Sequence, residues 1–181
     1  MQSIHFEELK IGMPGLSRSI GQYLAEAGAY CLAARGHHSG VVLKVERVEK
    51  ELLQLEWDEI IDQQVVRSWN DQQEATEYGA TAIAVLLLKQ YTDYTIVERS
   101  FKGTGFDYWL GTGKYNENVL PFEQRTARLE VSGIWKTSLT NTLAGRVRRK
   151  IRQVEQGGYS DIPAVIIVVE FHTPKSKMKT I

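Results

Sequence analysis

The chain has 181 residues, of which 43% are hydrophobic and 24% are charged, a composition typical of one soluble globular domain. Acidic and basic residues are equal in number, so the formal net charge is zero and a chain-wide basic surface is excluded. No apolar run is long enough to cross a bilayer, and the first eight residues lack a signal-peptide pattern. A single cysteine, Cys31, excludes an internal disulfide. We therefore expect a cytoplasmic protein that does not associate with membranes.

The N-terminal third reads as a lead-in, one helix and one hairpin. Residues 1–16 carry turn-forming Gly and Pro and are expected to be extended or turning. Apolar residues at helical spacing predict a helix over 17–34, with Ser17 as its N-cap. Two alternating segments, 41–48 and 53–57, predict a β-hairpin. We expect residues 1–70 to be an extension that packs on the rest of a single domain, or that forms a homodimer through the small residues of the helix.

The order of elements changes after residue 70. The pattern predicts a helix over 71–90, which becomes apolar on nearly all sides and should therefore be buried. Three short strands follow, over 94–100, 103–111 and 127–135, then a helix over 141–156 and a continuous apolar strand over 163–171. The basic stretch 175–179 is expected to be frayed. This order predicts an α/β (or α+β) fold in which helices flank a mixed central sheet.

Two carboxylates lie in the second and third central strands. Side chains alternate along a strand, so Glu130 shares one face with Arg128 and Ser132, and Asp107 shares one face with Trp109. If the two strands are neighbours, Asp107 and Glu130 converge on one point. Two carboxylates there would suit Mg²⁺ or Mn²⁺, with water and a phosphate as further ligands.

A third carboxylate is expected from the buried helix. Glu77 lies just before this helix becomes wholly apolar, and Glu74, one turn earlier, is the alternative. Both could also be ordinary glutamates near a helix N-terminus, where the helix dipole favours a negative charge.

The order of elements from Asp71 to Phe171, together with the spacing of Asp107, Glu130 and Ser132, resembles the restriction endonuclease-like PD-(D/E)XK superfamily. The resemblance implies a restriction endonuclease-like core over 71–181, with Glu77, Asp107 and Glu130 as metal ligands. Phe106 stands where the motif has proline, and Ser132 stands where it has lysine. That lysine helps to orient the attacking water and to stabilise the transition state.

Another cation could replace the missing motif lysine. Lys102, just before the second strand, and Lys150, on the following helix, are the candidates, and Ser132 would assist. The helix that carries Lys150 is rich in arginine. If the metal site is real, Arg146, Arg149 and Lys150 are expected to contact nucleic-acid phosphates.

Two functions follow from these patterns. The first is a metal-dependent endonuclease that hydrolyses phosphodiester bonds in DNA, using Mg²⁺ or Mn²⁺. The second is a catalytically inactive module of the same fold that binds nucleic acid or a protein partner, as the missing lysine suggests.

Overall fold

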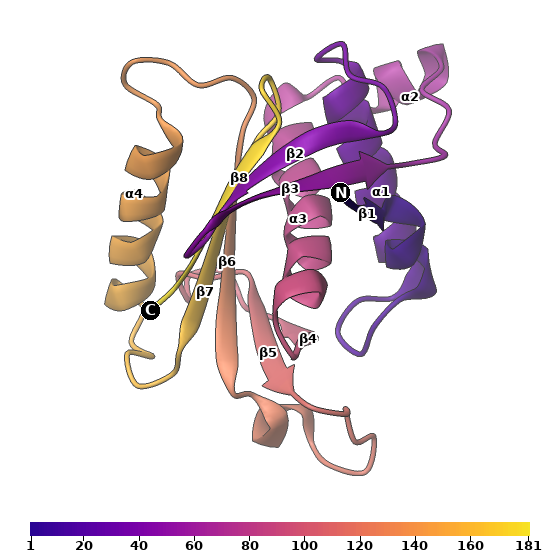
Figure 1. The fold of residues 1–181 in the computed structure, drawn as a ribbon. Coiled ribbons are helices and arrows are strands. Elements are labelled where there is room, and N and C mark those ends of the chain that lie inside the picture. The colour runs from indigo at the N-terminus through magenta and orange to yellow at the C-terminus, as the bar shows by residue number, and fades with distance from the viewer.

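The structure, a computed structural model that describes all of residues 1–181, is an α/β fold built on one mixed eight-stranded sheet (Figure 1). The strands lie in the order β1-β3-β2-β8-β7-β6-β5-β4. They are β1 (Gln2–His5), β2 (Val41–Glu46), β3 (Lys50–Glu56), β4 (Tyr94–Arg99), β5 (Tyr108–Thr112), β6 (Ala127–Ile134), β7 (Ala164–Glu170) and β8 (Lys175–Thr180). The helices are η1 (Phe6–Ile11), α1 (Arg18–Ala33), α2 (Gln63–Ser68), α3 (Gln72–Tyr91), η2 (Pro121–Gln124) and α4 (Leu143–Gln156).

The helices cover the two faces of the sheet unequally. Figure 1 shows α1 and α3 on one side and α4 alone on the other. A cluster of 36 buried apolar residues lies on the α1/α3 side, whereas a cluster of only nine lies beneath α4. No helix combines the length and the apolar composition that a membrane span requires.

Helix α3 is buried because it lies between the sheet and α1. Asp71 caps its N-terminus by accepting hydrogen bonds from the backbone N–H groups of Gln73 and Glu74. Beyond this polar start, every residue from Gly79 to Leu88 is buried. The prediction of a buried helix over 71–90 is therefore confirmed.

The small residues of α1 let it approach its neighbours closely. A Cβ added at Gly21 would overlap the carbonyl of Leu9 in η1, and one added at Gly28 would meet the Phe6 ring and the Cβ of Ala82 in α3. The small-residue face of α1 is thus covered within the chain. A homodimer through residues 1–70 would have to use other side chains.

Two predicted segments differ from the structure. Residues 1–16, predicted to be an extended or turning lead-in, contain a strand of the sheet, β1, and the 3-10 helix η1. The basic stretch 175–179 belongs to β8, which lies between β2 and β7 inside the sheet, so the prediction that it frays is wrong. In β8 the buried residues Ser176 and Met178 alternate with half-buried lysines, and Lys177 pairs with Glu46 at 3.2 Å. The lysines masked this period-two pattern in the sequence.

The predicted order from α3 onward is confirmed. β4, β5 and β6 form an antiparallel meander, α4 follows, and β7 pairs with β6 in parallel. The second strand is shorter than predicted, because β5 begins at Tyr108 and Asp107 lies in the bend before it. Phe106 and Trp109 pack together beneath α4 with ring centroids 4.6 Å apart, although three residues along a regular strand would put them on opposite faces.

Candidate functional site

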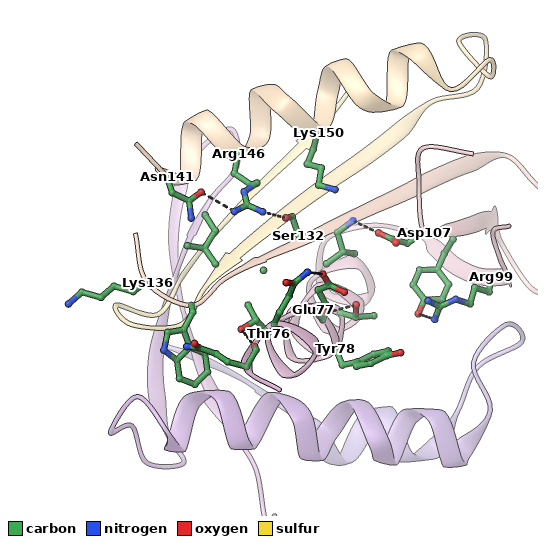
Figure 2. A pocket seen from close by; sticks show the side chains of 18 residues that line it. Thr76, Glu77, Tyr78, Arg99, Asp107, Ser132, Lys136, Asn141, Arg146 and Lys150 are labelled. Atoms are coloured by element: carbon green, nitrogen blue, oxygen red, sulfur yellow. Dashed lines mark hydrogen bonds between the residues drawn. The ribbon is translucent and has the colours of Figure 1, made fainter. Parts of the chain in front are cut away.

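The site begins where β5 separates from β6. β5 pairs with β6 only at Ala127–Leu129, while β6 continues to Ile134. A cleft of about 640 Å³ follows the remaining edge of β6 (Figure 2). We call it the β6 cleft. It is lined by Gln72, Gln73, Thr76, Glu77, Tyr78, Thr81, Arg99, Asp107, Tyr108, Val131, Ser132, Gly133, Ile134, Trp135, Lys136, Asn141, Arg146 and Lys150.

The position of Asp107 at the head of the β6 cleft is fixed by three hydrogen bonds. Its backbone N–H donates to the carbonyl of Leu129 at 2.9 Å, and its carbonyl accepts from the N–H of Ser100 at 2.8 Å. Its Oδ2 accepts from the backbone N–H of Val131 at 2.8 Å. The Asp107 carboxylate thus takes the place of β5 as the partner of β6 where the two strands part.

Glu130 meets Asp107 at this point, as predicted. Glu130 lies on the α4 face of β6 and is only 2% exposed. Burial, and next the charge of Asp107, raises the pKa of Glu130 to about 8. Burial also raises the pKa of Asp107. The two carboxyls therefore retain a proton near neutral pH, which a cation placed between them would displace.

Lys150, on α4, is the cation next to this carboxyl pair. Its Nζ lies 2.5 Å from Oε1 of Glu130. Gln153, one turn further along α4, accepts a hydrogen bond from Lys150 at 3.1 Å and donates to Glu130 Oε1, also at 3.1 Å. Gln153 also donates to the carbonyl of Gly105 at 3.0 Å, which ties α4 to the loop before Asp107.

Lys102, the other candidate for the missing lysine, is not in this arrangement. It is exposed and makes no ion pair, although it lines a second hollow that Asp107, Glu130 and Lys150 also line. Of the two lysines weighed from the sequence, the structure brings only Lys150 onto Glu130. Both lysines were candidates to replace the motif lysine, and the roles assigned to them in catalysis and phosphate binding stay predictions.

Helix α4 is held over β6 by a buried arginine. Arg128 is 2% exposed and points from β6 towards the C-terminal end of α4. Its Nη1 donates to the carbonyl of Val154 at 3.1 Å, and its Nε donates to the carbonyl of Ile162 at 3.0 Å. A cation is favourable at a helix C-terminus. This anchor fixes the helix face that carries Arg146, Lys150 and Gln153 against the site.

Ser132 orients an arginine instead of joining the carboxyl pair. Nη1 of Arg146 donates to Ser132 Oγ at 3.2 Å, and Nη2 donates to Asn141 Oδ1 at 3.0 Å (Figure 2). Arg149 donates to the same Asn141 oxygen at 3.2 Å. Nε of Arg146 is buried without a hydrogen-bond partner, and no carboxylate pairs with this guanidinium. Arg146 is therefore held in the β6 cleft by neutral groups, with its charge uncompensated.

Glu77 lines the same cleft from the opposite wall. It is exposed on the first half of α3, where its Oε1 accepts a hydrogen bond from Gln73 at 3.3 Å. Figure 2 shows it across the cleft from Arg146 and Lys150. No three His, Cys, Asp or Glu side chains are grouped so that they could hold a metal ion. The structure thus joins Asp107 to Glu130 and leaves Glu77 apart from them.

Sequence reasoning did not identify Arg99, Tyr78 and Gln153 as site residues. Arg99 ends β4 and is paired in register with Tyr108, so the register of the predicted hairpin places it beside Asp107. Gln153 lies seven residues after Arg146, which puts the two on one face of α4 together with Lys150. Tyr78 follows Glu77 and carried no signal of its own.

Comparisons of the chain with protein-family models, with curated proteins and with solved structures give no significant match. The site must therefore be interpreted from its own geometry.

Proposed function

We propose that this protein is a metal-dependent phosphodiester hydrolase that acts on DNA, with a restriction endonuclease-like core. The observation that carries the proposal is the carboxyl pair of half-buried Asp107, which lines the β6 cleft, and buried Glu130, which Lys150 contacts. Structural ion pairs are normally matched in charge and need no cleft. A pair of acids that share a proton beside one lysine is more typical of a catalytic site.

The chain's architecture agrees with this proposal. A helix, an antiparallel three-stranded meander, a second helix and a strand parallel to the last strand of the meander follow one another from α3 to β7. This is the order implied by the PD-(D/E)XK resemblance. The two carboxylates lie where the meander opens, between strands β5 and β6.

The donor set fits a hard divalent cation. Asp107 and Glu130 would hold Mg²⁺ or Mn²⁺, since Mg²⁺ in enzymes commonly binds one or two carboxylates and keeps several waters. Glu77 lies across the cleft and is not grouped with this pair, so it would interact with such an ion only through water. The bound metal would polarise a phosphodiester and lower the pKa of a water ligand.

The residues of α4 complete the site. Lys150 takes the role of the lysine that Ser132 replaces, because it brings a positive charge onto Glu130 from the helix instead of from β6. Gln153 hydrogen-bonds to both Lys150 and Glu130 and so fixes their relative positions. Arg146, with no carboxylate partner, binds a phosphate oxygen of the substrate, since a guanidinium forms two parallel hydrogen bonds to phosphate.

The test is a calorimetric titration of Mn²⁺ into the wild type and Asp107→Asn, followed by a cleavage assay with Mg²⁺ on plasmid and single-stranded circular DNA. We expect the wild type to bind Mn²⁺ and to cleave, and Asp107→Asn to do neither. Asp161→Asn, which changes an exposed aspartate outside the β6 cleft, is the matched control. Undiminished cleavage by Asp107→Asn would overturn the assignment.

A second function would replace the first if the wild type neither binds Mn²⁺ nor cleaves but still binds DNA in the presence of a chelator. The serine in place of the motif lysine favours this alternative, because Ser132 accepts a hydrogen bond from Arg146 and supplies no cation to the carboxyl pair. The protein would then be a nucleic-acid-binding module.

A further inference from the structure

An aromatic surface continues the β6 cleft on the side opposite α4. Tyr78 lines the cleft, and its ring meets that of Tyr23 edge to face with centroids 5.1 Å apart. Tyr23 in turn packs on Trp69, with centroids 4.7 Å apart. The three rings come from α3, α1 and the end of α2, so they form one continuous aromatic path from the cleft to the surface.

Trp69 is held in place at the buried end of this path, whereas Tyr23 is open to solvent. Trp69 is only 3% exposed, and its Nε1 donates a hydrogen bond to Glu26 at 2.9 Å. Tyr30 stacks on the same indole with centroids 6.4 Å apart. Tyr23, which packs on Trp69, is 42% exposed. A large ring held in place beside a polar cleft is a platform on which a flat ligand group can stack.

The β6 cleft carries more basic than acidic side chains, and two of the basic ones lie on the α4 wall. Six ionisable side chains of opposite sign line the cleft, two acidic (Glu77, Asp107) and four basic (Arg99, Lys136, Arg146, Lys150). Among the four cations only Lys150 has a carboxylate partner within ion-pair distance. Figure 2 shows Arg146 and Lys150 on the α4 side and Tyr78 on the other side of the cleft. A ligand that fits both walls carries negative charge along one edge and flat rings along the other.

We propose that the β6 cleft binds a single strand of nucleic acid, with the phosphates towards α4 and an unpaired base on Tyr23. This proposal rests on the proposed function and specifies its substrate class. Stacking on a protein ring requires the face of a base, and within a duplex these faces are covered by the neighbouring base pairs. Single-strand sites elsewhere combine a basic groove with aromatic platforms in the same way.

The experiment measures fluorescence anisotropy of a labelled oligodeoxythymidine, and of a duplex of the same length, in EDTA. We expect the wild type to bind the single strand more tightly than the duplex. Tyr23→Leu should weaken single-strand binding by about 5- to 150-fold, which corresponds to the loss of one stacked base, and should leave duplex binding unchanged.

Tyr159→Leu is the matched control for Tyr23. Tyr159 is similarly exposed, at 39%, and also packs on two aromatic rings, but, unlike Tyr23, it contacts no ring that lines the β6 cleft. It should bind as the wild type does. For the phosphate side, the slope of log K against log salt concentration is measured for single-strand binding. Arg146→Gln should reduce this slope by about the amount that one phosphate contact contributes. Arg148→Gln, at an exposed position on another face of α4, should leave the slope unchanged.

Duplex binding as tight as single-strand binding, or unchanged binding by Tyr23→Leu, would overturn the proposal. Circular dichroism of each variant checks that it is folded. Because binding is measured in EDTA, failure of metal binding or of cleavage leaves this test intact. Conversely, metal-dependent cleavage of duplex DNA that is unaffected by Tyr23→Leu would overturn this inference and leave the proposed function standing.

Discussion

The two faces of strand β6 carry opposite kinds of side chain. Towards α3 the strand presents Leu129 and Val131, which join the larger apolar cluster. Towards α4 it presents Arg128, Glu130 and Ser132, all of them buried. Burying polar and charged groups costs free energy unless each finds a partner. The α3 face of β6 therefore contributes stability, and the α4 face uses part of that stability to hold chemical groups in place.

The polar α4 face is tolerated because its groups are partnered one by one. Arg128 caps the end of α4, Glu130 contacts Lys150 and Gln153, and Ser132 accepts from Arg146. A site of this kind has its geometry fixed by hydrogen bonds instead of by apolar packing. Substitutions on the two faces should consequently affect different properties.

The largest effect on stability is expected in the apolar cluster between α3 and the sheet. Leu87→Ala, at a fully buried position of α3 in the larger cluster, should lower the free energy of unfolding by about 2–5 kcal/mol. Leu143→Ala, the same change in the small cluster beneath α4 at a position 7% exposed, should cost less, roughly 2 kcal/mol or below. Urea unfolding of both variants measures the difference. Equal losses would show that the two faces stabilise the fold alike.

The next effect concerns catalysis and distinguishes the two lysines. Lys150→Gln removes the cation that contacts Glu130 and should reduce metal-dependent cleavage by about 10²–10³-fold, as the loss of one group that stabilises transition-state charge usually does. Lys102→Gln, at an exposed position without an ion pair, should cleave at the wild-type rate. The comparison is made from single-turnover rates. A slow Lys102→Gln and a normal Lys150→Gln would show that Lys102, the other candidate from the sequence, replaces the motif lysine.

A smaller effect should appear in the pH dependence of stability. Burial raises the pKa of Glu130 from an ordinary value of 4.5 to about 8, so between these values the folded chain binds more protons than the unfolded chain. Stability therefore falls as the pH rises through this window. Glu130→Gln should flatten the slope and, at pH 9, raise the Tm by at least about 3 °C, since one kcal/mol corresponds to about 2–4 °C in a chain of this size.

Thermal scans of Glu130→Gln from pH 5 to pH 9 provide the measurement. Glu155→Gln, at an exposed position of α4, is the control and should keep the wild-type slope. If Glu130→Gln lowers the Tm at pH 9, the ionised carboxylate is stabilised by Lys150 more strongly than burial disfavours it.

The smallest effect is expected from the α3 side of the cleft. Glu77→Gln should weaken Mn²⁺ binding by about tenfold or less, because Glu77 is exposed and is not grouped with Asp107 and Glu130. Glu74→Gln, one turn earlier on α3, should leave the affinity unchanged. Calorimetric titration of Mn²⁺ into both variants measures the two affinities. A loss in Glu77→Gln as large as that in Asp107→Asn would mean that both faces of the sheet contribute ligands to the metal.

Much of the fold could be predicted because its signals are local. The apolar run of α3, the alternation in β6 and the continuous apolar β7 fixed the element order, and that order brought Asp107 and Glu130 together. Helix spacing also placed Arg146 and Lys150 on one face of α4. Such patterns depend only on neighbours along the chain.

The remainder depended on contacts between distant residues. The ion pair of Lys150 with Glu130 depends on the position of α4 along β6. The hydrogen bond from Arg128 to Val154 fixes that position, and residue spacing in the sequence does not predict it. The bend at Asp107 follows from the hydrogen bond of its carboxylate to Val131, 24 residues away. The place of β8 depends on its two neighbours, β2 and β7, and its lysines made the segment look solvated.

The position of β8 has a consequence for the order of folding. This strand is the only link between the β1-β3-β2 part of the sheet and the β7-β6-β5-β4 part, and its contact between Lys177 and Glu46 spans 131 residues. The hairpin of β2 and β3 can form early, because its partners are close in sequence. It cannot join the rest of the sheet until residues 175–180 are in place. Closure of such a long loop is slow, so the docking of this hairpin is expected to be the late, rate-limiting step of folding.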